Sequence, residues 1–170
     1  MGMFDVFTGT KRPPDDTPVR APGEVYDAIV AVNRPTAPFV IRDGRGDGVD
    51  LIAEWRIVDA RWYEIFAKAG LSKTFRVLMQ LDPERREVRA VDQEWEVEWR
   101  AGVPSLHAAA SGFRGQKTSV QFGTAYAFTE ELEFGQVYNY RFNSGELKKP
   151  IQEAVAAAGW TYRGVAFGKL

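Results

Sequence analysis

The feature that most constrains the fold is a period-two alternation of apolar and polar residues, which recurs in several separate segments. In residues 49–57 every second residue is apolar, and most of the residues between them are charged. The same alternation marks residues 75–81, 93–99 and 120–128. Side chains of a β-strand point alternately to its two faces, so the pattern predicts strands with one buried and one exposed face.

Turn sequences join the predicted strands in pairs. DGRGDG lies between 39–41 and 49–57, and DPERRE separates 75–81 from a return strand over 88–99. DGRGDG consists mostly of glycine and aspartate, and DPERRE has Pro83 in a favoured turn position, so both sequences favour a tight reversal of the chain. TEELEFGQ precedes a further strand over 138–142. Hairpins in succession predict an antiparallel sheet.

Helical spacing of apolar residues predicts helices over 25–32 and 59–70, and an alanine-rich segment predicts a short one over 105–111. A last helix is expected to begin near Pro150 rather than at Ser144, because proline fits a first turn but is costly in a helix interior. Gly159 fits its C-terminus.

These elements predict an α+β fold. We expect an antiparallel sheet of about six to seven strands, built from successive hairpins, with three to four helices packed on it. A variant of this fold curls the sheet toward a half-barrel. The sequence WTYRGVAF forms the final strand.

The chain of 170 residues suits one domain. Residues 9–23 hold four prolines among charged and small residues, which is typical of a linker or an extended strap. We therefore divide the chain into an N-terminal tail and proline-rich linker, residues 1–23, and a single α+β domain, residues 24–170.

Composition excludes several kinds of chemistry. There is no cysteine, so disulfides, thiolate nucleophiles and cysteine-ligated zinc are impossible. The one histidine, His107, excludes a multi-histidine metal site. As a general base it would need an orienting acid and a nucleophile within about 3 Å, and no nucleophile motif accompanies it. A net charge of −1 gives no sign of a nucleic-acid partner. No apolar run suits a transmembrane segment or a secretory signal, so we expect a cytoplasmic protein.

The stretch DQEWEVEWRAG mixes acids with tryptophans and raises the question of an acidic binding site. Alternation separates them: Gln93, Trp95, Val97 and Trp99 share one strand face, and the glutamates lie on the other. Three same-face carboxylates spaced roughly 6.6 Å apart cannot all bind one ion, since metal–oxygen distances are about 2.0–2.6 Å. We interpret Glu94, Glu96 and Glu98 as a solvated face offset by cross-strand arginines such as Arg76 and Arg89.

Two sets of residues are candidates for a ligand site. The tryptophans could floor a cavity for an apolar or ring-shaped ligand, or fill a core. Basic residues on and near a glycine-bracketed loop, with the lysines at 148 and 149, could bind phosphate or carboxylate, or form an ordinary turn. No nucleotide-binding glycine motif supports a nucleotide. The candidate ligand-binding residues are Trp55, Trp95, Trp99, Arg114, Lys117 and Arg141.

Because catalytic signatures are absent, we expect a non-enzymatic binding or protein-interaction module, with no catalytic residue, metal or cofactor. The alternative is an enzyme or carrier for a small anionic or aromatic ligand. An apolar patch formed by Met3, Phe4 and Phe7 precedes the linker. It either docks on the domain or contacts a protein partner, and a second copy of the chain is one such partner.

Overall fold

The computed structural model describes residues 9–35, 37, 39–56, 73–101, 103–108, 114–115, 120–128, 134–165 and 170. Three predictions lie outside these residues: the helix over 59–70, the apolar patch of Met3, Phe4 and Phe7, and the position of Lys117.

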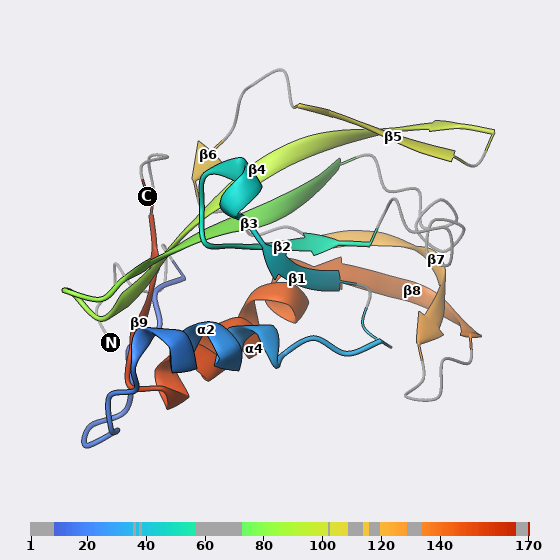
Figure 1. Cartoon of the computed structure of the whole chain (residues 1–170). Coiled ribbons are helices and arrows are strands. Elements are labelled where there is room, and N and C mark those ends of the chain that lie inside the picture. Colours follow the sequence, from blue (N-terminus) through green and yellow to red (C-terminus); the bar gives the residue numbers. More distant parts are fainter. Residues whose placement is uncertain are drawn as a thin grey trace.

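The main sheet is built around β4, the longest of the described strands (Figure 1). Five strands follow one another in chain order, each antiparallel to the next. They are β1 (Phe39–Asp43), β2 (Leu51–Trp55), β3 (Lys73–Asp82), β4 (Glu87–Arg100) and β5 (Val103–Ala108). The two hairpins predicted at DGRGDG and DPERRE are thereby confirmed. In the first, the 3-10 helix η1 (Arg45–Asp47) forms the turn.

One edge of β4 pairs with β3, while three short segments share the other edge. Besides β5, these are β6 (Arg114–Gly115), which is antiparallel, and β9 (Thr161–Gly164), which is parallel. The sheet is therefore mixed, and the predicted purely antiparallel sheet is wrong. The strand β9 follows a helix rather than a hairpin turn, so no tight reversal dictates its direction.

The described strands do not close into a half-barrel either, because the path from β1 to β5 is open at both ends. A second, two-stranded sheet contains β7 (Val120–Phe128) and β8 (Phe134–Asn143). This confirms the third predicted hairpin, but the pair is not hydrogen-bonded to the main sheet.

Two α-helices, α2 (Pro22–Val30) and α4 (Ser144–Ala157), are present in the described part of the chain, against the expected three to four. Figure 1 shows both on the same side of the main sheet. The helix predicted over 105–111 is wrong, because residues up to Ala108 form β5. The edge of the long strand β4 offers backbone partners to Val103–Ala108, which outweighs the helical preference of alanine there.

Helix α4 begins at Ser144, so the expected start near Pro150 is wrong and the proline lies inside the helix. A proline there withholds one helical hydrogen bond and costs about 3 kcal/mol. Leu147 and Lys148, in the turn before it, are both buried and fix that turn against the sheet.

The prediction that Gly159 ends this helix is confirmed. Gly159 has φ of +77°, and its N–H donates to the carbonyl of Ala156 while that of Trp160 donates to Val155. These two bonds define a Schellman cap. A side chain could not replace the hydrogen, because a Cβ at this position would lie 2.5 Å from the carbonyl oxygen of Pro18.

Residues 9–21 lie along β9 and the end of α4 as a strap. Lys11 and Tyr162 exchange two backbone hydrogen bonds of 2.8 Å each. Further along, the backbone N–H of Arg20 donates to Ala158, and its carbonyl accepts a bond from Trp160 Nε1. The strap therefore covers the edge of β9 that does not pair with β4.

The main core lies between the sheet and the two helices. Side chains from every second position of the strands pack there against α2 and α4. A smaller cluster lies on the opposite side of the sheet, which we call the outer face, and contains Val49, Ile52, Leu78 and Val91 with Leu170 packed against them. Apolar residues are thus buried on both faces of β2, β3 and β4.

Candidate functional site

A row of polar side chains crosses the outer face from β2 to β4. The strand register places Glu54 opposite Arg76, and Arg76 opposite Gln93. Directly opposed residues of antiparallel strands point to the same face, so these side chains are neighbours. Arg76 Nε donates a hydrogen bond of 2.7 Å to Gln93 Oε1.

Trp95 holds the Arg76 guanidinium from another direction. The guanidinium carbon lies 4.8 Å from the centre of the Trp95 ring, within the range of a cation–π contact. The Arg76 side chain is 18% exposed. Its position is thus fixed by stacking and by the amide of Gln93, while part of its surface remains open to solvent.

Both groups have hydrogen-bonding capacity that is not used. A guanidinium carries five N–H donors. Among the described residues, Arg76 makes one hydrogen bond, to Gln93, and a longer ionic contact of 3.9 Å between its Nη2 and Asp47 Oδ1. Trp95 Nε1 is buried, and no group in the described part of the chain accepts a hydrogen bond from it. Buried donors in folded proteins are almost always paired. An unpaired donor here therefore indicates that the cluster lacks an acceptor.

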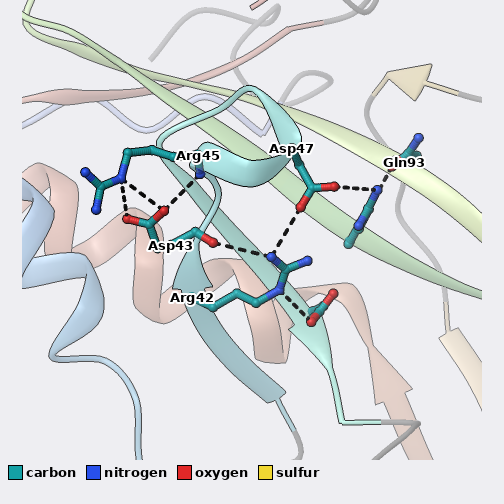
Figure 2. A network of polar contacts seen from close by, with 7 residues as sticks. Arg42, Asp43, Arg45, Asp47 and Gln93 are labelled. Atoms are coloured by element: carbon teal, nitrogen blue, oxygen red, sulfur yellow. Dashed lines mark hydrogen bonds and ion pairs between the residues drawn. The ribbon is translucent and has the colours of Figure 1, made fainter.

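Strand β1 adds a second arginine to the cluster, and the turn that follows it adds Asp47 (Figure 2). Arg42 Nε donates to Glu54 Oε1 at 2.9 Å, and its Nη1 lies 3.3 Å from Asp47 Oδ2. The bond to Glu54 raises the pKa of Arg42, so its charge is secure. Asp47 therefore stands between the two arginines, closer to Arg42 than to Arg76.

The arrangement is suited to binding an acceptor-rich, negatively charged group. Guanidinium groups match the geometry of carboxylates and phosphates, and an indole N–H adds a neutral donor. We call Arg42, Arg76, Gln93 and Trp95, with Asp47 over them, the donor cluster.

The predicted ligand-binding residues are distributed around the sheet. Trp95 belongs to the donor cluster, and the backbone of Arg114 is paired with Gln93 at its margin. Trp55 lies on the helix face, where its ring packs edge-on against Phe39 with centroids 6.4 Å apart. The sheet thus separates Trp55 from Trp95, which do not floor one cavity together. Trp99 and Arg141 lie on β4 and β8, and their side chains are outside the described part of the structure.

The predicted site combined tryptophans with basic residues, but Arg76 was not among the predicted basic residues. Arg76 and Arg89 were expected to offset the glutamates of β4. Arg76 instead binds Gln93, and Arg89 lies 3.7 Å from Glu87 of its own strand. The signal was available, because DPERRE fixes the register that places Arg76 opposite Gln93.

The acids of DQEWEVEWRAG follow the predicted alternation where the structure describes them. The side chains of Glu96 and Glu98 are exposed, and Glu98 forms an ion pair of 3.0 Å with Arg100. The first acid of the stretch differs. Asp92 is fully buried, in a row that crosses the sheet through Ile41, Ala53 and Val77.

Asp92 is paired with Lys148 of α4, whose ammonium group donates to Asp92 Oδ2. Burial of one partner alone would be costly, so the pair exists as a unit. Lys148 is therefore unable to serve the basic surface pocket expected from the two lysines at 148 and 149. The sequence signal was an acid at a position where alternation from Val88 and Ala90 demands an apolar residue.

Tyr162 lies in the same core and is completely buried. Burial raises the pKa of its hydroxyl well above the usual value, and the charge of Asp92 raises it further. No described residue forms a hydrogen bond with this hydroxyl.

Among the described residues, no group of three or more histidine, aspartate or glutamate side chains could hold a metal ion. No helix within the described ranges is long and apolar enough to cross a membrane. Comparison of the chain with protein-family models, with curated proteins and with solved structures found no match.

Proposed function

We propose that the protein is a non-enzymatic binding module that holds a small anionic ligand at the donor cluster. The observation that carries the proposal is the surplus of fixed donors there. Within the ranges that the structure describes, the Arg76 guanidinium is held in place but makes one hydrogen bond, and the buried indole N–H of Trp95 beside it has no acceptor. A ligand with several acceptor oxygens supplies what both groups lack.

The chemistry of the cluster favours binding over turnover. A guanidinium, a carboxamide and an indole are neither nucleophiles nor proton acceptors at neutral pH. Asp47 and Glu54, the carboxylates beside them, are each paired with Arg42. The groups of the cluster are therefore suited to recognising a charge.

The test measures binding of small oxyanions by titration calorimetry at constant ionic strength. A panel of inorganic phosphate, sulfate, acetate and benzoate covers tetrahedral, planar and aromatic anions. We expect at least one to bind, and Arg76→Gln to weaken it by about 2 kcal/mol, or roughly thirtyfold. Trp95→Phe keeps the aromatic ring but removes the N–H, so a loss of roughly fivefold is expected.

Arg45→Gln is the matched control. Arg45 lies on the same hairpin and is 83% exposed, but it pairs with Asp43 and does not contact Arg76. Its substitution removes the same charge and should leave affinity unchanged. Equal losses in Arg45→Gln and Arg76→Gln would show that binding depends on net charge alone, and the proposal would then be wrong.

A further inference from the structure

We infer that Asp47 is a built-in competitor for the anion site, a carboxylate of the protein's own chain that a bound ligand must displace. The inference rests on the proposed function and adds its regulation. It follows from the position of Asp47 over the two arginines of the donor cluster and from the way the turn holds it.

The position of Asp47 is that of a weakly bound anion. Its carboxylate lies 3.3 Å from Arg42 Nη1 and 3.9 Å from Arg76 Nη2. Hydrogen bonds between charged groups are about 2.7–2.9 Å long, so neither contact is a good one. The carboxylate partly neutralises Arg76 but leaves its donors unsatisfied. An anion free of the chain could approach closer.

The turn lets Asp47 leave at little cost. Asp47 is the last residue of η1, a single turn of 3-10 helix between Gly44 and Gly48. Its side chain is 39% exposed. The backbone bond from Asp47 N–H to the carbonyl of Gly44 does not involve the side chain, so rotation about its side-chain bonds can move the carboxylate into solvent.

Departure of Asp47 does not leave Arg42 without a counter-charge. Arg42 keeps the shorter bond of 2.9 Å to Glu54 on the neighbouring strand. When Asp47 leaves, the positive charge that loses its counter-charge is therefore mainly that of Arg76. The space between Arg42 and Arg76 then becomes available to a ligand. The expected ligand class is a small oxyanion, carboxylate or phosphate, that bridges the two guanidinium groups in place of Asp47.

The test compares Asp47→Asn with the matched variant Asp43→Asn. Both remove one negative charge from the same hairpin. The carboxylate of Asp43, however, bonds Arg45 and the hydroxyl of Tyr26, and only its backbone carbonyl, which the substitution keeps, accepts a bond from Arg42. Calorimetric titration with inorganic phosphate and with acetate, at constant ionic strength, should show about tenfold tighter binding for Asp47→Asn. Asp43→Asn should bind like the unchanged protein.

Asp47→Ala provides a second variant, since the loss of the carboxylate alone should produce the gain. If the unchanged protein binds an anion and the Asp47 variants bind it no more tightly, the competitor role is overturned while the binding site stands. An equal gain in Asp43→Asn would also overturn it, because net charge would then explain the effect. If neither anion binds to any of these proteins, the competitor role fails together with the proposed function.

Discussion

The Trp95 indole and the Tyr162 hydroxyl, two of the buried donors for which no described residue is an acceptor, differ in their surroundings. Trp95 adjoins a partly exposed guanidinium, where a ligand can supply the missing acceptor. Tyr162 lies in the core between the sheet and α4, where solvent has no access. An unpaired hydroxyl of that kind costs free energy without a compensating contact.

Tyr162→Phe should therefore leave the free energy of unfolding unchanged or raise it by about 1 kcal/mol. The pKa of Tyr162 is raised in the folded protein, so the unfolded chain ionises first as pH rises. The hydroxyl's contribution is complete below about pH 10, the pKa of an unfolded tyrosine, and is lost as pH rises toward the folded value.

Urea unfolding of both proteins between pH 7 and 11 checks this expectation. The advantage of Tyr162→Phe should grow above about pH 10. A destabilisation at pH 7 would show that the hydroxyl makes a contact that the prediction leaves out.

At the scale of single residues, the sequence showed which residues were unusual. It did not show which residues they contact. Asp92 interrupts an apolar alternation and Trp95 stands among acids, and both are visible in the chain. Their partners Lys148 and Arg76 come from other elements, so finding them requires the strand register and the placement of α4.

Among the elements, α4 and β4 are joined by the ion pair of Lys148 with Asp92. Buried apolar residues accompany the pair, including Val77 of β3, which lies opposite Asp92, and Leu147 of α4, which precedes Lys148. Such a pair contributes little net stability, because desolvation offsets the attraction between the charges. Removal of either partner, however, leaves a buried charge without its counter-ion.

We expect Asp92→Val and Lys148→Met each to lower the free energy of unfolding by about 3–5 kcal/mol. The double variant, with two apolar side chains in contact, should recover most of that loss. Urea unfolding of the four proteins gives the coupling energy directly. Additive losses in the double variant would mean that the two charges act independently.

The strands and turns were largely predictable because alternation and turn residues are local signals. Three hairpins were placed correctly from DGRGDG, DPERRE and TEELEFGQ. The start of α4 and the strand β5 were not, because tertiary contacts override the local preference of Pro150 and of the alanine-rich segment. No local sequence signal gives the direction of β9, because that direction depends on where α4 ends relative to the sheet.

At the scale of the whole molecule, the strap of residues 9–21 covers an edge of the main sheet. It pairs with β9 through Lys11 and supplies a carbonyl to the buried Trp160 from Arg20. Another edge is covered in a similar way, since the side-chain amide of Asn33 makes two hydrogen bonds of 2.7 Å with the backbone of Ile41 on β1. The composition of the strap suggested an extended segment, but not where it docks.

Deletion of residues 1–20 should lower the free energy of unfolding by about 2–4 kcal/mol, from the lost backbone bonds and the uncovered Trp160. Val19→Ala, at a site 47% exposed, serves as the control and should have little effect. Urea unfolding measures both variants.

Light scattering on the truncated protein also tests self-association through Met3, Phe4 and Phe7. A smaller assembly after truncation supports that prediction, and an unchanged one contradicts it. A truncated protein as stable as the full chain would show that the strap is not part of the folded unit.

The shared edge of β4 has a consequence for synthesis of the chain. Residues Glu87–Ala90 of β4 find their parallel partners in Thr161–Gly164, more than seventy positions later. A ribosome adding about 5–20 residues per second completes β3 and β4 several seconds before β9 emerges. During that interval the nascent hairpin presents an uncovered backbone edge to whatever lies nearby, including other nascent copies. The strand β9, the last of the described strands, is thus made well after the edge of β4 that it covers.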